Sequence, residues 1–400
     1  MTVAVADDYV YLDWAATAPL CEEAAAAMAP YLAPGAANVA LGMNANSLHA
    51  PGRAAFEAME LARRSFSRCI GASRPSEVVF TSGATEACNA ALIGLAHAKA
   101  AELKRRSGAD GPARVIVSEI EHDAVLRPAA RLEAEGFDVV RLKPDAAGFL
   151  RLADFKEALN ERTVLASIQF ANSEMGAIQP IAEMARAAHQ AGALFHTDAT
   201  QALGKLAVDV GALGVDAASF SAHKVCGPKG VGALHLKART PFEPFLLGGG
   251  QEEGKRSTTQ NVCGIVGFTA ALEAACGLLE AESSRQRTLR DGLYRKLCAL
   301  EGVRATVPAL DQPDVYLPNI LNVLVRGFES ETLVLRLDAM GFGVSGGSAC
   351  SSHSLEPSHV LRAMGVSTDD AYGALRISIG RYTTESELDR FAAAFGDCIS

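Results

Sequence analysis

The chain has 400 residues, with 37 Lys and Arg against 46 Asp and Glu and a formal net charge of −9. The length predicts two or three domains, and the acidic balance without a polybasic run excludes nucleic acid and anionic membrane as fitting partners. Nine Cys are scattered without metal-ligand spacing, which argues against a metalloenzyme. No signal peptide is visible, so we expect a cytoplasmic protein with reduced thiols.

Apolar, β-branched runs alternate with Ala-rich helical segments between about residues 76 and 240. This pattern is typical of an α/β domain with a mostly parallel sheet covered by helices. The candidate strands, each bounded by turn-forming residues, are Glu77–Thr81, Arg114–Ser118, Val139–Leu142, Val164–Phe170, Leu194–Thr197, Ala217–Ser221 and Gly232–Leu236.

A long Ala-rich helix follows this alternating region. Its most membrane-like part, Val262–Ala281, carries Glu273 at its middle, which favours a buried or bridging helix over a membrane span. A Pro-punctuated segment and a shorter mixed α/β pattern come next. They predict a second, smaller domain.

The first candidate binding feature is a predicted helix N-terminus. The segment Glu77–Glu86 reads as a strand, a turn containing Gly83 and then an apolar helix. Backbone N–H groups and the Thr85 hydroxyl would bind a phosphate there, because the positive end of the helix dipole lies at that point. The alternative is an ordinary helix cap, and the missing GxxxxGK[ST] pattern disfavours a nucleotide P-loop.

Two more polar residues follow predicted strands. Asp198 comes directly after an apolar strand and Lys224 comes shortly after another, where open α/β sheets bind their ligands. The alternatives are a helix cap for Asp198 and a surface lysine at a turn for Lys224. Burial would lower the pKa of Lys224 and make it a competent amine nucleophile. Phosphate site, acid and lysine together match the needs of pyridoxal 5′-phosphate (PLP).

One cysteine stands apart from the others. Cys350 lies in Val344–Ser354 among small polar residues that do not pack a core, so we expect an exposed, reactive thiol. Cys226, two residues after Lys224, is interpreted as a packing residue near the proposed cofactor. Apolar helical surroundings predict small core residues at Cys88, Cys263 and Cys276.

A series of short motifs runs nearly the whole length of the chain: Tyr11–Asp13, Ala15–Thr17, Thr81–Glu86, Glu121–His122, His196–Gln201, Ser221–Lys224, Gly227–Gly230, Pro318–Asn322 and Ser348–Cys350. In this order they resemble the cysteine desulfurases, the NifS/IscS-like class of fold type I PLP-dependent enzymes in the class-V aminotransferase family. The resemblance implies a large PLP-binding domain over residues 20–262. It implies a small domain over residues 1–19 and 263–400, which includes the long linking helix and the Cys350 loop.

The resemblance also implies roles around the cofactor ring. Lys224 would bind the aldehyde, Asp198 would pair with the ring nitrogen, and His122 would stack on the ring and move protons. Gln201 would meet the phenolic oxygen. Ser173 stands where the family usually has an Asn with that same contact, and its hydroxyl would substitute.

Further implied contacts hold the phosphate and the substrate. The phosphate would be bound by Ala84, Thr85, Ser221 and His223. Thr259 would reach it from the second subunit of a homodimer. Arg376 resembles the arginine that clamps the substrate carboxylate, and Asn44 and His49 lie in the segment that lines the substrate side. The chain departs from the family pattern at Trp14, Asn44–Ser47, Ser173 and Glu253.

The implied activity removes sulfur from L-cysteine, giving L-alanine and a persulfide on Cys350. A sulfur-acceptor protein, such as an iron–sulfur scaffold, or a thiolation pathway would consume the persulfide. The alternatives are a selenocysteine lyase, another fold type I lyase or aminotransferase, or a non-catalytic PLP-fold regulator of sulfur transfer. Cys350 argues against transamination, which needs no thiol.

Overall fold

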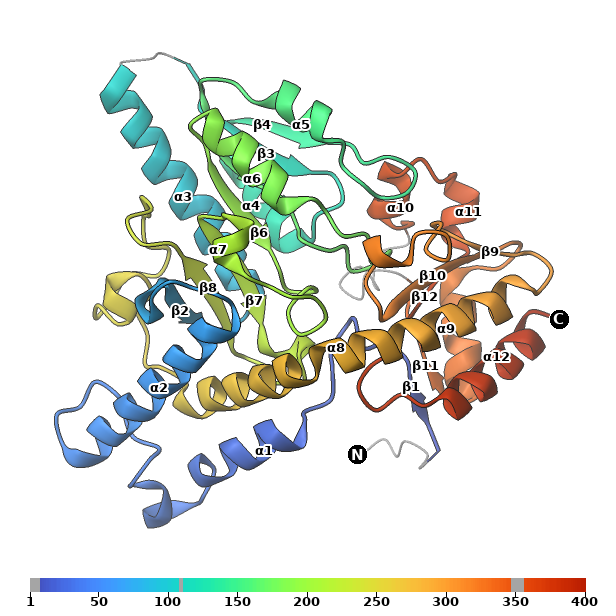
Figure 1. The fold of residues 1–400 in the computed structure, drawn as a ribbon, viewed down its shortest axis with the longest axis horizontal. Helices are drawn as coiled ribbons and strands as arrows, with labels where there is room; N and C mark the ends of the chain where they lie inside the picture. The colour runs from blue at the N-terminus through green and yellow to red at the C-terminus, as the bar shows by residue number, and fades with distance from the viewer. Residues whose placement is uncertain (1–7, 108–110, 347–355) are drawn as a thin grey trace.

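The computed structural model describes residues 8–107, 111–346 and 356–400 (Figure 1). Seven strands form the large sheet in the order β2-β8-β7-β6-β5-β3-β4. Their bounds are β2 Val78–Thr81, β3 Arg114–Ser118, β4 Asp138–Leu142, β5 Thr163–Ser167, β6 Leu194–Asp198, β7 Ala217–Ser221 and β8 Gly232–Leu236. Strands β7, β6, β5, β3 and β4 pair in parallel, whereas β8 is antiparallel to both β2 and β7. The seven expected strands and the mostly parallel sheet are confirmed.

The strands read as continuous apolar runs because helices cover both faces of the large sheet. Val115 and Val117 on β3 pack with α3 and α4, while Ile116 between them packs in a second core with α2, α6 and the start of α8. The helices of this region are α1 Glu22–Met28, α2 Ala50–Cys69, α3 Ala84–Ser107, α4 Asp123–Ala134, α5 Leu152–Ala158, α6 Ile181–Gln190 and α7 Val210–Leu213. Alternation of side chains across β3 therefore builds two cores, one on each face.

A second unit follows α8, which spans Val262–Cys298. Its antiparallel sheet has the order β12-β10-β9, and a two-stranded parallel sheet pairs the N-terminal β1 with β11. The bounds are β1 Val10–Tyr11, β9 Val303–Ala305, β10 Ile320–Val325, β11 Phe342–Gly343, β12 Ala374–Ser378, α9 Ser330–Ala339, α10 His359–Ala363, α11 Thr368–Tyr372 and α12 Glu385–Ile399. The N-terminal strand thus lies beside the C-terminal unit (Figure 1).

Helix α8 is the one helix in the described parts of the chain that is long and apolar enough to cross a membrane. It packs on α1 and α2 near its start and on α12 and β10 near its end, so it runs along both units (Figure 1). Glu273 accepts a hydrogen bond from Ser65 on α2, which explains an acid within the apolar stretch. These contacts confirm the expected bridging helix. Cys276 is exposed on α8, so its assignment to the core was wrong: this residue lies on the helix face that solvent reaches.

Candidate active site

The carboxyl ends of the parallel strands and the N-terminus of α3 surround a cavity of about 470 Å³. Most of the residues expected to contact a cofactor or substrate line it: Ala84, Thr85, His122, Ser173, Asp198, Gln201, Ser221, His223, Lys224 and Arg376. Residues from distant parts of the sequence therefore converge on one space. Asn44, His49 and Thr259 are not among the lining residues of this chain.

Lys224 lies in a short 3-10 turn, Ala222–Lys224, directly after β7. Its Nζ donates hydrogen bonds to the carbonyl oxygens of Ala15 at 2.5 Å and Ala16 at 2.6 Å. Both acceptors belong to the N-terminal segment, which therefore orients the amine at the cavity wall. A cofactor aldehyde at this position would react with an amine that is already held in place.

Asp198 ends β6 and is almost fully buried, with Oδ1 accepting the N–H of Thr200 at 3.0 Å. Burial is the larger cause, and the Asp198 charge the next, that raises the pKa of the nearby Cys88 thiol, so Cys88 stays neutral. Burial also lowers the pKa of His196 to about 4, and its ring nitrogens bond to the hydroxyls of Ser167 and Ser219. Asp198 is thus a buried carboxylate among neutral groups, which suits a protonated ring nitrogen.

The end of the cavity where a phosphate is expected is formed where the Ser82–Ala84 turn meets the sheet. A β-carbon on Gly232 of β8 would lie 2.6 Å from the Cα of Gly83, so glycine at position 232 permits this close approach. His223 bonds through Nδ1 to the Thr17 hydroxyl at 3.1 Å. Burial, followed by the charge of Lys224, lowers the pKa of His223 to about 4. A neutral His223 can donate one hydrogen bond to a phosphate.

Glu86 lies in the first turn of α3, where its charge would oppose a phosphate. Arg256 binds both of its carboxylate oxygens, at 2.6 and 2.8 Å, and the Ser82 N–H binds one of them at 2.9 Å. Although burial opposes its ionisation, these contacts hold the pKa of Glu86 below its ordinary value. The bidentate pair neutralises Glu86 and leaves the α3 N-terminus attractive to an anion.

The cavity fits PLP in size and in polar character. Its volume lies in the range of small-ligand pockets, which is roughly 300–1,000 Å³. Three buried polar atoms on its lining residues have no hydrogen-bond partner: Thr200 Oγ1, Gln201 Oε1 and Arg376 Nε. Buried polar atoms are normally satisfied, so this lining calls for a polar ligand.

Arg376 on β12 reaches the cavity wall from the small antiparallel sheet and is itself buried. Its Nη2 forms a 2.7 Å ion pair with Asp13, and its Nη1 donates to the Ser173 carbonyl oxygen at 3.2 Å. Arg376 contacts the backbone of Ser173, so this hydrogen bond does not depend on whether position 173 carries Ser, as here, or the Asn that is usual in the family. The Gln201 amide donates to the Ala15 carbonyl oxygen at 2.9 Å.

Two departures from the family pattern lie off the cavity. Trp14 is buried, donates to the Tyr11 carbonyl oxygen at 3.0 Å, and lines a separate space of about 60 Å³. Cys226 lines that smaller space too, where burial raises the pKa of its thiol to about 11. Glu253 is exposed and pairs with Lys255 at 2.7 Å. These two departures leave the wall of the large cavity unchanged.

Asn44 and His49 lie off the large cavity of this chain, and their expected place on the substrate side stays a prediction. His49 is the N-cap of α2 and accepts the Gly52 N–H at 3.2 Å, while Asn44 accepts the Asn46 N–H at 2.9 Å. Local capping and turn formation occupy both side chains. The expected part of Thr259, which requires a second subunit, stays a prediction.

Glu121 lies directly before His122 of the cavity wall, and the sequence did not reveal its environment. It is fully buried, and its Oε1 accepts from the Ser118 hydroxyl at 2.5 Å and from the Gln169 N–H at 2.9 Å. Burial raises the pKa of Glu121 to about 8, so it is protonated at neutral pH. The sequence signal that could have pointed to Glu121 is its place directly before His122, but only the fold shows that the Glu121 side chain faces inward.

Cys350 lies outside the described residues, but the chain on either side of it is anchored near the cavity. Before the gap, Ser345 pairs through its backbone with Arg376, at 2.7 and 3.2 Å. After it, the Ser358 hydroxyl donates to Glu174 at 2.5 Å, and the His359 ring bonds to the Glu121 carbonyl oxygen at 3.1 Å. Both flanks thus meet residues at or next to the cavity wall.

The model of the aminotransferase class-V family matches residues 10–391. A cysteine desulfurase IscS from Dictyoglomus turgidum is 42% identical over 95% of this chain and 92% of its own. The chain belongs to the cysteine desulfurases of the class-V aminotransferase family. A second cysteine desulfurase, from Cereibacter sphaeroides, is 42% identical over 95% of this chain and 93% of its own.

Solved structures place this cysteine desulfurase in the same fold. A structure titled NIFS-LIKE PROTEIN has a TM-score of 0.86 at 36% identity and covers 97% of this chain and 98% of its own. Another, titled SspA in complex with cysteine, has a TM-score of 0.78 at 33% identity and covers 94% of this chain and all of its own. The expected family and fold class are confirmed.

Proposed function

We propose that the chain is a PLP-dependent enzyme that takes sulfur from L-cysteine, releases L-alanine and carries the sulfur as a persulfide on Cys350. One observation carries the proposal: a single cavity brings together an oriented lysine, a buried aspartate and a buried arginine, Lys224, Asp198 and Arg376. Cysteine desulfurases at 42% identity and a relative solved with cysteine support this substrate.

The residues of this chain divide the work of holding PLP. Bound at Lys224, PLP supplies an electron sink for the α-carbon of the substrate. Asp198 holds the proton on the ring nitrogen, and the α3 N-terminus with Ser221 and His223 binds the phosphate. His122 accepts the Ala124 N–H through Nδ1 at 3.0 Å, so its own proton is carried on Nε2. That nitrogen moves protons beside the ring.

Arg376 orients the substrate and Cys350 removes its sulfur. The Cys350 thiolate attacks the substrate sulfur, and the new S–S bond forms as the C–S bond breaks. The electron pair of that bond returns to carbon, where a proton completes the methyl group of alanine. The anchored flanks at Ser345 and Ser358 support delivery of Cys350 to the cavity.

We also propose a homodimer, in which Thr259 completes the phosphate site of the partner. Large apolar side chains are exposed before α2 and after β8: Leu48 is 90% and Leu247 is 83% exposed. A second copy would cover them. Analytical ultracentrifugation tests the homodimer. A wild type that sediments as a dimer and a Leu247→Glu variant that sediments at a lower mass would support it, and a wild type that sediments as a monomer would refute it.

The persulfide needs an acceptor. We propose a sulfur-acceptor protein such as an iron–sulfur scaffold, a proposal supported by relatives named IscS. Mixing the persulfidated enzyme with a purified scaffold and following the label from 35S-cysteine tests it. Label moving to the scaffold supports the proposal, and label that stays on the enzyme contradicts it.

The function is tested by product analysis on the purified wild-type protein with bound PLP, L-cysteine and a thiol reductant. Alanine and sulfide formed in equal amounts support the proposal. Activity restricted to L-selenocysteine would replace it with a selenocysteine lyase, and amine transfer to a 2-oxo acid without sulfide would replace it with an aminotransferase. Bound PLP with no product would point to a non-catalytic regulator.

A further inference from the structure

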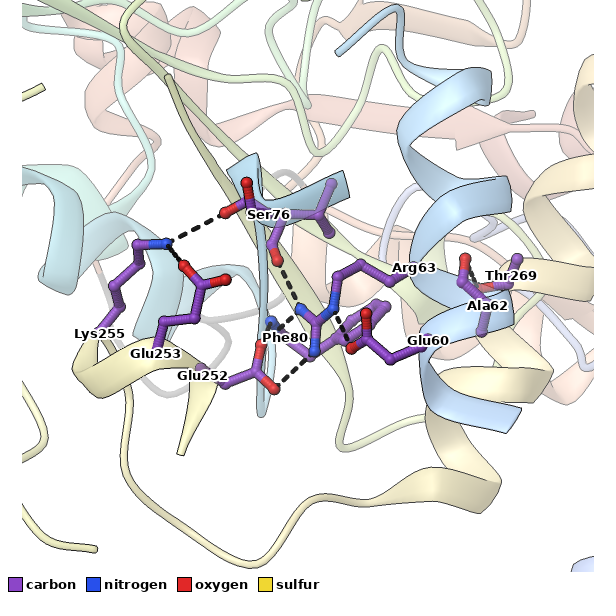
Figure 2. Close-up of polar contacts among 10 residues, drawn as sticks. Glu60, Ala62, Arg63, Ser76, Phe80, Glu252, Glu253, Lys255 and Thr269 are labelled. Atoms are coloured by element: carbon purple, nitrogen blue, oxygen red, sulfur yellow. Dashed lines mark hydrogen bonds and ion pairs between the residues drawn. The ribbon is translucent and has the colours of Figure 1, made fainter. Parts of the chain in front are cut away.

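Arg63 on α2 and Glu252 in the loop after β8 form a buried ion pair away from the cavity (Figure 2). Two guanidinium nitrogens bind the two carboxylate oxygens at 2.7 and 2.9 Å. Only 8% of the Arg63 side chain and 1% of the Glu252 side chain are exposed. Removing two charges from water opposes folding, so such a pair is a weak stabiliser and needs another explanation.

The pair caps the edge of the large sheet. Strand β2 is the edge strand, and Arg63 Nη1 donates to its Val78 carbonyl oxygen at 2.6 Å. Glu252 Oε2 accepts the Phe80 N–H at 3.0 Å, and the Arg63 guanidinium lies 4.9 Å from the centre of the Phe80 ring. One donor and one acceptor of the ion pair thus take the hydrogen bonds that a further strand would make.

The same pair holds a turn whose backbone is unfavourable. Glu252 and Glu253 have φ of +52° and +55°, a region that residues with side chains rarely adopt, and Gly250 and Gly254 on either side have φ of +80° and +78°. Lys255 adds a contact from its Nζ to the Ser76 carbonyl oxygen at 3.1 Å (Figure 2). A turn of this conformation persists only where its surroundings hold it.

This turn leads directly to the cavity. Arg256 comes two residues after Gly254, which ends the turn, and it binds Glu86 at 2.6 and 2.8 Å in the first turn of α3. Glu86 lines the cavity next to Ala84 and Thr85. The position of Arg256, and therefore the neutralisation of Glu86, depends on how residues 250–254 are held.

We propose that the Arg63–Glu252 ion pair is a positioning element for the phosphate end of the cavity, which it controls through Arg256 and Glu86. The inference rests on the proposed binding of PLP. When the pair is weakened, the turn relaxes, Arg256 shifts, and the Glu86 carboxylate repels the phosphate at the α3 N-terminus. The effect falls on the phosphate and not on the ring, because Lys224 and Asp198 lie on other elements.

Comparing the binding of PLP with that of pyridoxal, which lacks the phosphate, separates an effect on phosphate binding from an effect on ring binding. Full-length protein is titrated with each compound, and binding is followed by the fluorescence of Trp14, the chain's one tryptophan. Glu252→Gln and Arg63→Lys are expected to weaken PLP binding about tenfold, the scale of one charge-assisted hydrogen bond, with pyridoxal affinity within about twofold of wild type. The matched control Glu253→Gln, one residue away but exposed, keeps the wild-type preference for PLP over pyridoxal.

Three results would overturn the inference. The first is a preference for PLP over pyridoxal that stays at the wild-type value in both Glu252→Gln and Arg63→Lys, even if their Tm is lower. The second is a change in that preference in Glu253→Gln as large as in the two pair variants. The third is a loss of PLP affinity in the double variant, Glu252→Gln with Arg256→Gln, that equals the sum of the two single losses. Action through Arg256 instead predicts that the double variant binds PLP no more weakly than Arg256→Gln alone. A wild type that binds neither compound would refute the proposed function itself, whereas a wild type that prefers PLP keeps that function whatever the variants do.

Discussion

The guanidinium of Arg376 and the carboxylate of Asp13 form a 2.7 Å ion pair that joins β12 to the N-terminal segment at the cavity wall. With the bond from Nη1 to the Ser173 carbonyl oxygen, the pair fixes the plane of the guanidinium. The third nitrogen, Nε, is buried without a hydrogen-bond partner. Arg376 is therefore preorganised, and the N–H donors that these two contacts do not use, the one on Nε among them, are left for the carboxylate of an amino acid substrate.

Arg376→Lys is expected to raise KM for L-cysteine by about tenfold to a hundredfold, with a smaller change in kcat. Lysine keeps the charge but loses the planar set of donors that Asp13, Ser173 and the substrate share. Steady-state kinetics on protein of equal PLP content measures this. A KM equal to that of the wild type would remove Arg376 from substrate binding.

Glu121 predicts a specific dependence of stability on pH. Burial raises the pKa of Glu121 to about 8 from an ordinary value of 4.5, so the folded chain keeps this proton after the unfolded chain has lost it. The contribution of Glu121 to the free energy of unfolding therefore falls as pH rises from about 4.5 to 8, by at most about 1.4 kcal/mol per pH unit.

Urea unfolding of the wild type and of Glu121→Gln between pH 5 and pH 9 tests this sign. The amide imitates the protonated acid and does not titrate, so the variant should gain stability relative to the wild type as pH rises. The comparison cancels groups common to both proteins, such as His196, whose pKa burial lowers to about 4. Parallel pH profiles would contradict a buried, protonated Glu121.

Trp14 and Gly380 predict a size constraint that is separate from the cavity. A β-carbon at position 380 would lie 2.0 Å from two atoms of the Trp14 ring. Gly380→Ala is expected to lower the free energy of unfolding by about 1–3 kcal/mol, and by much less in a Trp14→Ala background, where the ring is gone.

Gly277→Ala is the matched control for that prediction. Gly277 lies within α8 and has no atom within 4 Å of an added β-carbon, so alanine should stabilise the chain by about 0.5–1 kcal/mol. Urea unfolding of the wild type and of the four variants, Gly380→Ala, Trp14→Ala, their double variant and Gly277→Ala, measures all of these changes. An equal loss from Gly380→Ala with and without the Trp14 ring would place the constraint elsewhere.

The large sheet was predictable because its strands are buried on both faces. Arg114–Ser118 and Ala217–Ser221 have the same bounds in the sequence interpretation and in the structure. Lys224 and Asp198 were also predictable as neighbours, since both follow strands that end at the same edge of the sheet. Local pattern and one topological rule were sufficient for these residues.

The remaining features depend on tertiary contacts that no local pattern encodes. Ala15 and Ala16 bind Lys224 through carbonyl groups, which every residue carries. The inward position of Glu121 and the pairing of Arg63 with Glu252 join residues far apart in the chain. Asn44 and His49 take part in local turns and caps of this chain, and their expected place on the substrate side stays a prediction.

The most direct test of the account compares the wild type, Lys224→Ala and Cys350→Ala by visible absorbance and by alanine and sulfide formed from L-cysteine. The account predicts that the wild type binds PLP and forms both products, and that Lys224→Ala loses the absorbance of lysine-bound PLP. Cys350→Ala keeps that absorbance and forms neither product. Wild-type rates of alanine and sulfide formation in Cys350→Ala would contradict the central claim that this thiol takes the sulfur.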